Sequence, residues 1–484
     1  MPITIPGLDW AAITGPLTLV IAALVLLVAD LFITNKRVIA YLGLLGLLIT
    51  AVLLIPQYSS TPRAAFSDMI VSDPTAVVLQ WILLLLTAIT ILFSVDYLQR
   101  LGIERGEYYP LLLFCTAAML FMTQGRNLIV QFLALEWLSI GLYVLAGFAY
   151  PKIRSEEAAM KYLLYGSFAA GFLIYGVALI YGAVGTVDMP GIAGAVRDNP
   201  ALQNDPLLLG GAALVLIGFC YKISIVPFHM WTPDVYEGSP TPVAGYMSAA
   251  TKVAGFAAVF RVVQLALPPT VFPSWQLALA ILAALTMIVG NLTAVVQLNV
   301  KRMLAYSSVA HAGFILVGLV AYTPDGLQAF LYYLLAYGLT NLGAFAVVIA
   351  LENAGEERFD LGALAGLGWR RPLLGAAMTI FMLSLAGVPP IAGFFAKFLV
   401  FTAAYRAGYW WLALIGLLTS VISAFYYLRI IVNMYMREGE GTPATFVTPT
   451  LRIGLVIAAV VVLLQGLLTN PVLQLVPTIE TALR

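Results

Sequence analysis

The sequence predicts an all-α polytopic membrane protein, and three features of its composition and patterning support this fold class. Hydrophobic residues make up 62% of the 484 positions and charged residues only 10%, whereas a soluble domain carries about 45–50% and about 25%. Apolar runs recur along the whole chain, so the protein is not a soluble domain with one anchor. The runs are continuous rather than alternating, which favours helices over a β-barrel.

Apolar runs of roughly 20 residues, the length that crosses a bilayer, predict about fourteen helices. The first run lacks the basic flank of a cleavable signal, so we expect it to be a retained helix. The fourth run is short, and the twelfth is long and contains Pro389-Pro390. Cutting the chain at polar, glycine-rich and proline-rich breaks places the helices at 16–34, 38–56, 75–97, 109–123, 127–149, 157–182, 206–228, 241–266, 275–297, 302–321, 326–351, 372–402, 409–435 and 449–472.

Composition also excludes several classes of function. The net charge is +1, so the chain offers no basic field for nucleic acid. The two cysteines, Cys115 and Cys220, lie far apart inside apolar runs and provide no metal, Fe–S or disulfide spacing. The chain contains neither a G-x-G-x-x-G fingerprint nor a P-loop. We therefore expect no cofactor on this chain.

Basic residues are unevenly distributed between the two sets of loops. Fourteen spans place both termini on one side of the membrane. Because cytoplasmic loops collect Lys and Arg, both termini are expected to face away from the cytoplasm. Loops opposite the termini carry twelve basic residues: Lys36, Arg37, Arg100, Arg105, Lys152, Arg154, Lys301, Arg302, Arg358, Arg370, Arg371 and Arg437. Loops on the side of the termini carry five: Arg63, Arg126, Arg197, Arg406 and Arg484.

Charges near the middle of predicted helices are the most informative residues, because each costs roughly 2.5–3.5 kcal/mol on insertion scales. The four central charges are Glu136, Lys222, Lys252 and Lys397. The plainer interpretation is a structural ion pair, or a lysine that extends to the interface. Extension to the interface suits Lys161, one turn inside its helix, better than Lys252, which lies halfway along the eighth run. The central charges are therefore candidates for proton transfer.

The chemistry of buried lysine suits such a transfer. A lysine in a low-dielectric site releases its proton more readily than in water, and a nearby carboxylate stabilises the charged form again. A metal site is a poor alternative, since the two histidines, His229 and His311, have no carboxylate cluster around them. Small residues on the face of Lys252 permit either close helix contact or room for water. Glu136 shares a helix face with Ser139 and Tyr143, and Lys252 shares one with Gly245, Ser248, Ala249 and Gly255. Ser307 and Ser308 lie one turn before His311, and Tyr333, Tyr337 and Asn341 form a polar stripe on the eleventh predicted helix.

Two predicted helices are interrupted by proline, which removes a backbone donor. The seventh contains Lys222-Ile-Ser-Ile-Val-Pro227, and the twelfth contains Gly387-Val-Pro389-Pro390-Ile-Ala-Gly393. Freed backbone at membrane depth must lie against protein or a watery cavity. Five helices separate the breaks, which is the spacing of an inverted repeat. The predicted division is helices one to three at 1–105, a first repeat at 106–268, a second at 269–440 and the last helix at 441–484.

Three motifs resemble the antiporter-like subunits of respiratory complex I, and most of all subunit N, the subunit-2 type with its cyanobacterial and chloroplast relatives. The first is Pro227-Phe-His-Met-Trp-Thr-Pro-Asp-Val-Tyr-Glu-Gly-Ser-Pro-Thr-Pro-Val243, followed by Ser248 to Lys252. The second is Ser384-Leu-Ala-Gly-Val-Pro-Pro-Ile-Ala-Gly-Phe-Phe-Ala-Lys397, and the third is Lys301-Arg-Met-Leu-Ala-Tyr-Ser-Ser-Val-Ala-His311. The likeness extends over the whole chain.

The resemblance implies a proton relay. Glu136 would be the fifth-helix carboxylate and Lys222 its partner on the seventh helix. Lys252 would be the central lysine and Lys397 the distal one, where the related M type has a glutamate. His229 and His311 resemble the polar residues of the relay axis, and Lys161 is kept as a further candidate.

The resemblance also implies a proton-translocating subunit of NADH-quinone oxidoreductase, a translocase. M-type and K-type subunits would be its neighbours in the lipid bilayer. FMN, Fe–S clusters and quinone are expected on partner subunits, where the redox reaction occurs. The expected location is the bacterial inner membrane, and a thylakoid-type membrane stays open.

Other functions compete with this one. A subunit of a multisubunit cation/proton antiporter shares the fold, but the stretch from Trp231 to Gly238 favours the complex I relative. A stand-alone solute carrier would need a substrate pocket at the midplane, whereas the buried polar groups here are of proton-relay type. A purely structural scaffold would use the buried charges only to hold helices together.

Overall fold

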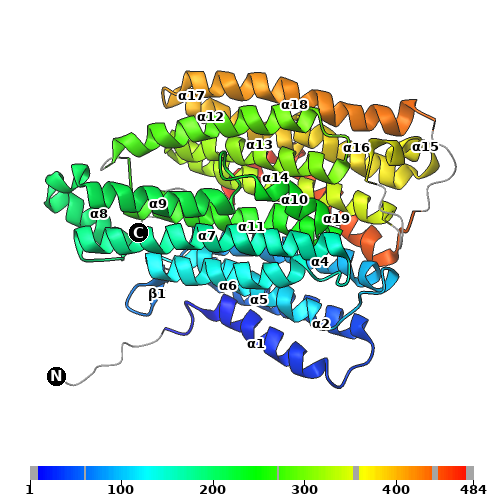
Figure 1. The fold of residues 1–484 in the computed structure, drawn as a ribbon, viewed down its shortest axis with the longest axis horizontal. Coiled ribbons are helices and arrows are strands. Elements are labelled where there is room, and N and C mark those ends of the chain that lie inside the picture. Colours follow the sequence, from blue (N-terminus) through cyan, green and yellow to red (C-terminus); the bar gives the residue numbers. More distant parts are fainter. Residues whose placement is uncertain (1–8, 59–60, 270–271, 353–358, 439–444, 476–484) are drawn as a thin grey trace.

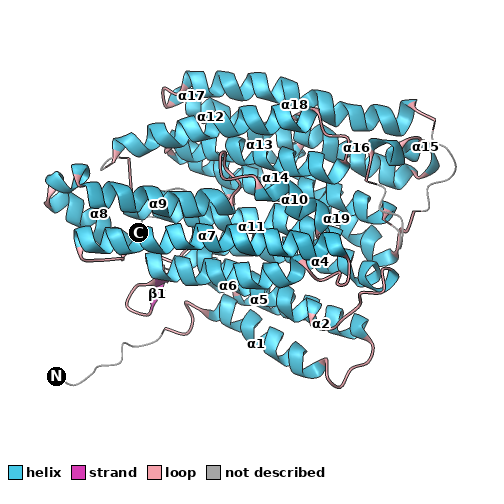
Figure 2. Ribbon diagram, in the orientation of Figure 1, coloured by secondary structure: helices cyan, strands magenta, loops and turns pink. Residues whose placement is uncertain are grey.

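The computed structural model describes residues 9–58, 61–269, 272–352, 359–438 and 445–475, which form one bundle of roughly parallel and antiparallel helices (Figure 1). Helices account for nearly all of the regular structure, and the small hairpin of β1 and β2 lies at one end of the bundle (Figure 2). The all-α prediction is therefore confirmed. In chain order the elements are α1 (Thr14–Ala29), α2 (Lys36–Leu53), α3 (Ile55–Tyr58), β1 (Arg63–Ala65), β2 (Ile70–Ser72), α4 (Pro74–Arg100), α5 (Tyr108–Gln124), α6 (Leu128–Ala146), α7 (Ile153–Val184), α8 (Met189–Asp198), η1 (Pro200–Asn204), α9 (Pro206–Lys222), α10 (Trp231–Gly238), α11 (Thr241–Arg261), η2 (Val262–Ala266), α12 (Pro273–Val295), α13 (Val300–Ala321), α14 (Pro324–Leu351), η3 (Leu361–Leu364), α15 (Leu367–Arg370), α16 (Pro372–Ala386), α17 (Ala392–Arg406), α18 (Trp410–Met436), α19 (Pro449–Leu467) and α20 (Thr469–Gln474).

Thirteen of the fourteen predicted runs each correspond to one apolar helix in the described part of the chain, and the twelfth corresponds to two helices, α16 and α17. Among the described residues, ten helices are long enough to cross a membrane on their own, and α1, α5, α9 and α16 are shorter apolar helices. The sequence did not predict α8, α10 or the hairpin. Residues 223–230 are not helical, so the seventh run ends earlier than predicted and a separate helix begins at Trp231.

Helix starts follow simple local chemistry, in which a short polar side chain accepts a bond from a free backbone amide. Asp73 accepts from Ala76 N at 2.8 Å at the start of α4, and Thr323 accepts from Gly326 N at 3.1 Å at the start of α14. Proline follows each of these caps, where its missing N–H removes no helical bond.

The centre of the bundle is formed by α11, α13 and α14, which are the most buried of the long spans. By contrast, fewer than half of the residues of α2, α7 and α18 are buried. Exposed apolar residues over this length match the hydrocarbon core of a membrane or a partner's helices. The residues that face inward on the central helices are therefore the ones available for buried chemistry.

The two broken helices end in the same way. At the end of α9, Ile225 N donates to Cys220 O at 2.9 Å, and at the end of α16, Val388 N donates to Leu383 O at 2.9 Å. Such a six-residue bond closes a helix when the preceding residue is left-handed. Ser224 has φ 62° and Gly387 has φ 86°. The closing bonds and the left-handed residues therefore match residue by residue between the two breaks. The bonds Val226–Pro227 and Pro389–Pro390 are both cis.

A second pair of matching contacts lies at opposite ends of the bundle. Leu128 N donates to Val187 O at 3.0 Å, and Val300 N donates to Phe359 O at 2.6 Å. The first contact joins the start of α6 to the segment before α8, and the second joins the start of α13 to the segment before η3 and α15. Figure 1 shows α8 and α15 at opposite ends.

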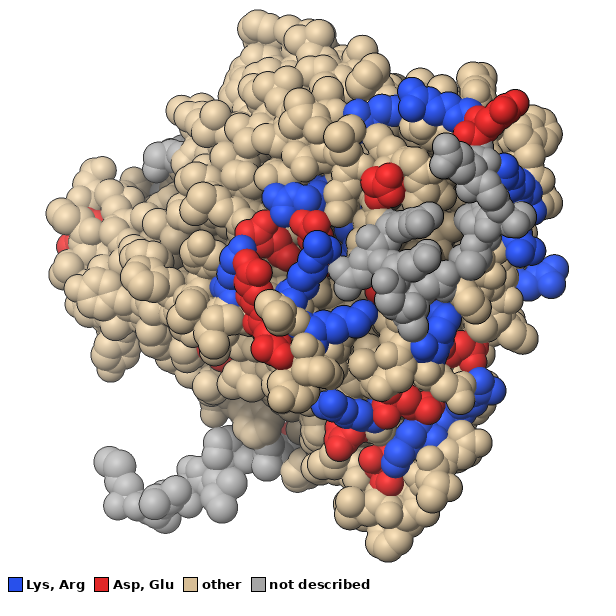
Figure 3. All heavy atoms as spheres, turned by 45° about the vertical axis from the view of Figure 1, so that its right-hand side comes forward, with Lys and Arg blue, Asp and Glu red and all other residues tan. Residues whose placement is uncertain are grey.

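Charged side chains gather on one end face of the molecule, turned toward the viewer in Figure 3. Figure 3 brings forward the right-hand end of Figure 1. Because α8 follows α7 and lies at the left-hand end, α7 begins at this charged right-hand end. The rest of the surface visible in Figure 3 is largely uncharged, as expected for a membrane-embedded belt.

Candidate functional site

Lys222, the last residue of α9, is buried between two helices of the first half of the chain. Its Nζ donates to Ser139 Oγ on α6 at 3.0 Å and to Tyr162 OH on α7 at 3.2 Å. Only 2% of the residue is exposed, so these hydroxyls replace the water that a surface lysine would have. The break after α9 thus starts directly beside a buried amine.

Glu136 lies on α6 one turn before Ser139, but it does not contact Lys222 directly. No ion pair within 4.0 Å joins the two charges among the described residues, although they interact electrostatically. The carboxylate is half-buried, and its Oε1 has no hydrogen-bond partner in the described part of the chain. Among the described residues the structure therefore shows Lys222 bound to Ser139 and Tyr162, and no salt bridge between Lys222 and Glu136.

Lys252 links the seventh-helix break to α13. Its Nζ donates to the carbonyl of Ile223 at 3.2 Å and to the carbonyl of Ser308 at 2.6 Å. In a continuous helix the amide of residue 227 would bond to the Ile223 carbonyl, but Pro227 has no N–H. The break therefore leaves the Ile223 carbonyl without a backbone donor, and Lys252 donates to it instead.

The face of α11 that carries Lys252 is tightly packed. A Cβ at Gly255 would lie 2.6 Å from Ile223 Cγ2, and a Cβ at Gly245 would lie 3.0 Å from Leu342 Cδ1. Of the two possibilities left open by the sequence, close helix contact holds at these positions. Gly255 lets α11 approach the break closely enough for Lys252 to reach it.

Lys397 has the corresponding position at the second break. Its Nζ donates to the carbonyls of Leu385 at 2.9 Å and Ala386 at 3.2 Å, and it lies 3.5 Å from Ser423 Oγ. These carbonyls are the ones that the amides of residues 389 and 390 would bind in a continuous helix. Both positions are proline, so the lysine satisfies acceptors that the break sets free.

His311 on α13 lies among three buried tyrosines. Its Nδ1 is 2.9 Å from Tyr333 OH, its Nε2 is 3.1 Å from Tyr427 OH, and its ring stacks on Tyr337. The Tyr427 hydroxyl also bonds to Ser307 Oγ. The predicted stripe on the eleventh helix thus includes two partners of the histidine, whereas Asn341 has no side-chain partner among the described residues.

One face of α13 connects these groups. Ser308, His311 and Phe314 are three residues apart and therefore share a face. The Ser308 carbonyl binds Lys252, and the Phe314 ring lies 4.9 Å from Lys397 Nζ. Six residues of helix span about 9 Å. We call Lys222, Lys252, His311 and Lys397 the lysine line.

Two further candidates lie outside the lysine line. His229 is half-buried in the seventh-helix break, packs near Tyr306, and leaves Nδ1 without a partner in the described residues. Lys161 is 36% exposed and pairs with Glu157 and Asp234, both at 2.8 Å. Lys161 therefore extends to the charged end face, as expected for a lysine one turn inside its helix.

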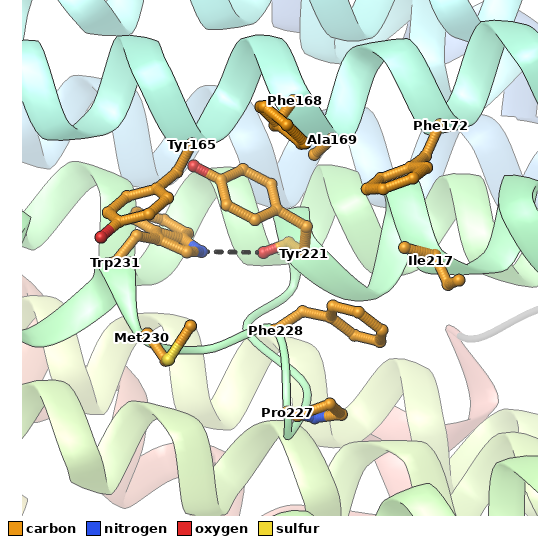
Figure 4. A pocket seen from close by; sticks show the side chains of 10 residues that line it. All are labelled: Tyr165, Phe168, Ala169, Phe172, Ile217, Tyr221, Pro227, Phe228, Met230 and Trp231. Atoms are coloured by element: carbon orange, nitrogen blue, oxygen red, sulfur yellow. Dashed lines mark hydrogen bonds between the residues drawn. The ribbon is translucent and has the colours of Figure 1, made fainter.

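An apolar cavity of about 320 Å³ lies on the outer side of the seventh-helix break (Figure 4). Aromatic side chains from α7, including Tyr165 and Phe168, face Tyr221 and Trp231 across it, and Trp231 Nε1 donates to Tyr221 O at 3.0 Å. The lining is largely apolar, and none of the four residues of the lysine line belongs to it.

Sequence reasoning missed two buried charged sites. Arg261 and Asp73 form an ion pair of 2.6 Å, and Glu352 accepts hydrogen bonds from Tyr97 and Thr241. Arg261 was visible in the sequence as a basic residue inside a predicted helix. Glu352 follows the eleventh helix directly, a position that looked like an ordinary loop.

Apolar helices broken at matching positions, with a buried lysine at each break and a third between them, define an antiporter-like membrane subunit. A family model described as NADH:quinone oxidoreductase/Mrp antiporter, TM, matches residues 125–423. NADH-quinone oxidoreductase subunit N 1 of Herpetosiphon aurantiacus is 51% identical over 470 residues, which cover 96% of this chain and 95% of that protein.

Solved structures agree. A chain of respiratory complex I from Thermus thermophilus, with bound aureothin, is 36% identical and has a TM-score of 0.81, covering 95% of this chain and 98% of that chain. A chain of the Mrp complex from Dietzia has a TM-score of 0.83 at 24% identity, with 96% of each chain covered, and shows the shared fold alone. The chain belongs to the NADH:quinone oxidoreductase/Mrp antiporter family and, within it, to the subunit N group of NADH-quinone oxidoreductases.

Proposed function

We propose that the chain is the proton-translocating membrane-arm subunit N of an NADH-quinone oxidoreductase, and that it couples quinone reduction on partner subunits to proton transfer. The observation that carries this proposal is the lysine line, in which buried amines take the carbonyls freed by both helix breaks. M-type and K-type subunits would be its neighbours. FMN, Fe–S clusters and quinone would lie on partner subunits.

The relay runs from Glu136 and Lys222 through Lys252 and His311 to Lys397. A charge change near Glu136 would alter how strongly Lys222 holds its proton, since opposite charges in a dry site stabilise each other. The proton would then pass along the face of α13, where His311 and its tyrosines supply groups that both donate and accept. Tightly packed stretches between these groups would act as gates.

Two inverted five-helix repeats would organise this path. The matched breaks support the pairing of the repeats, and the matched contacts at opposite ends of the bundle support the inversion. Each repeat would then supply a half-channel open to one side of the membrane. The cation/proton antiporter alternative has weaker support, since the Mrp likeness is of fold alone.

Glu136 is expected to act through its charge. Glu136→Gln should lower proton pumping clearly, because it removes the negative charge that stabilises protonated Lys222. Glu136→Asp keeps the charge and shortens the reach, so its effect should be milder. Proton uptake per electron in vesicles with the intact complex measures both. Equal activities for the two variants would show that charge is not the relevant property. Lys222→Ala, measured alongside, should lower pumping at least as much as Glu136→Gln.

The charged end face is expected to be cytoplasmic in the bacterial inner membrane. The tally of twelve basic residues against five motivates this orientation. Arg63→Cys and Arg371→Cys replace two exposed residues that are predicted to lie on opposite sides of the membrane. An impermeant maleimide applied to intact cells should label the first and not the second. The reverse pattern would invert the directions of both half-channels. The predicted sides of Arg358 and Arg484 concern positions outside the described residues.

A further inference from the structure

A buried ion pair lies where α4 begins and α5 and α11 end, away from the lysine line. Arg261 Nη1 is 2.6 Å from Asp73 Oδ2, with side-chain exposures of 2% and 4%. Asp73 is also the residue that caps α4. Burying two charges carries a large desolvation penalty that an ion pair only partly offsets, so this pair calls for an explanation beyond stability.

Arg261 is held rigidly in this position. Its Nε donates to the carbonyl of Thr123 at 3.0 Å. Thr123 lies in the last turn of α5, whose free carbonyls form the negative end of the helix dipole. The arginine is thus fixed by the ends of three helices, and it contacts α4 through Asp73 and α5 through Thr123.

Among the described residues, buried polar atoms without hydrogen-bond partners lie on Arg261, on Gln264 one turn after it, and on three glutamines near the end of α5. Within the described residues, Arg261 Nη2 and both side-chain polar atoms of Gln264 have no hydrogen-bond partner, although each residue is at most 5% exposed. Buried polar atoms normally bind protein or ordered water, so this region suits ordered water. We call the region that holds Gln80, Gln124, Gln131 and Gln264 the glutamine chamber, and in the described part of the chain each of the four has a buried side-chain oxygen without a partner.

Contacts around the end of α5 bring the chamber together. Gln80 Nε2 donates to Thr123 Oγ1 at 3.2 Å, and Gln131 Nε2 donates to Met122 O at 2.9 Å and Gly125 O at 3.0 Å. Gln264 belongs to η2, one turn beyond Arg261, and α8 packs over η2. The chamber therefore lies at the end of the bundle that carries α8 and β1, on the left in Figure 1.

The chamber comes close to the relay. Gln131 precedes Ser139 by eight residues on α6, a distance of about 12 Å along the helix axis. Ser139 is the hydroxyl that binds Lys222. Leu135 and Leu138, both buried, lie between them. Without a further barrier, water in the chamber would let protons near Lys222 leave the first repeat at the end of the bundle that carries α8 and β1, instead of continuing to Lys252.

We propose that Arg261 is a barrier that prevents protons of the first repeat from leaving through the glutamine chamber; this inference rests on the proposed relay. The ion pair with Asp73 has no net charge, so the barrier rests on the hydrogen-bonding chemistry of the guanidinium. A guanidinium has five donors and no acceptor, so it cannot take a proton and pass it on, and donors that line a narrow watery passage exclude protons. Asp73 and Thr123 hold the guanidinium in place, and protons must continue along the lysine line to Lys397.

The test is a double variant, Asp73→Asn with Arg261→Gln, in the intact complex. Asn still caps α4, and the Gln amide still donates toward Thr123. The matched control is Asp9→Asn with Arg63→Gln, an exposed pair at 3.8 Å with the same charge change. The measurement is decay of an imposed pH gradient in proteoliposomes without turnover. Decay should be several-fold faster in the double variant and unchanged in the control. Decay at the wild-type rate in both would overturn the barrier.

Two further measurements keep the test decisive. Adding Lys222→Ala to the double variant should return the leak to the wild-type rate if the leak passes through the relay. If Lys222→Ala leaves pumping normal, the proposed function fails, whatever the leak shows. An experimental map of the unmodified complex that resolves water elsewhere should show ordered water bound to Arg261 Nη2 and Gln264. Its absence there would also overturn the proposal, even if the double variant does not assemble.

Discussion

Lys252→Ala is expected to abolish proton transfer through this chain while the complex still assembles. Lys252 is the group that joins the seventh-helix break to α13, through the carbonyls of Ile223 and Ser308. Proton transfer by a positioned side chain is commonly worth about 100-fold or more, so the rate through this path should fall by at least that factor. Proton uptake per electron in proteoliposomes measures the effect, with quinone reduction measured in the same preparation.

Two controls accompany this variant. Lys252→Arg keeps the positive charge but not an amine that releases its proton readily, so it should also fail to pump. Lys36→Ala removes a lysine from a partly exposed pair with Asp30 and should leave pumping unchanged. Normal pumping in Lys252→Ala would favour the structural-scaffold interpretation, in which the buried charges only hold helices together.

Lys397→Ala is expected to have a comparable effect at the other end of the lysine line. The variant leaves the carbonyls of Leu385 and Ala386 without their donor and removes the last amine of the relay. Protons would then reach His311 but find no group at the second break to receive them. Proton uptake per electron should fall to the level of Lys252→Ala, and the double variant should be no worse than either single one.

Ser423→Ala is the matched control for this second prediction. Ser423 Oγ lies 3.5 Å from Lys397 Nζ, farther than either carbonyl, so its loss should change pumping little. A Ser423→Ala variant as inactive as Lys397→Ala would indicate that the hydroxyl, not the freed carbonyls, places the lysine.

The spans, the breaks and the central charges could be predicted from the sequence because each has a strong local signal. A run of about twenty uncharged apolar residues is long enough to cross a membrane. Proline has no N–H and therefore removes a backbone hydrogen bond of a helix. A lysine in the middle of a membrane helix is energetically costly unless it has a polar or charged partner. Those signals led to Glu136, Lys222, Lys252 and Lys397. The roles of these residues stay predictions, but their positions in the structure explain why proline and lysine occur close together.

Contacts between distant helices could not be predicted in this way. That Ser139 and Tyr162 bind Lys222, and not Glu136, depends on how α6, α7 and α9 pack. The pairing of Arg261 with Asp73 joins residues nearly two hundred positions apart. Arg261 was visible as a basic residue in the last turns of a predicted helix, but arginine commonly extends to the interface from such a position, so the sequence did not indicate its burial.

Each lysine of the line has two close acceptors in the structure. Lys222 has two hydroxyls, Lys252 two carbonyls, and Lys397 two carbonyls with a more distant hydroxyl. A charged ammonium has three N–H groups, whereas a neutral amine has two. Losing the proton therefore breaks none of the close bonds, and the side chain need not reorganise between its two charge states. A proton relay through these three lysines would therefore transfer charge without requiring the lysine side chains to change position.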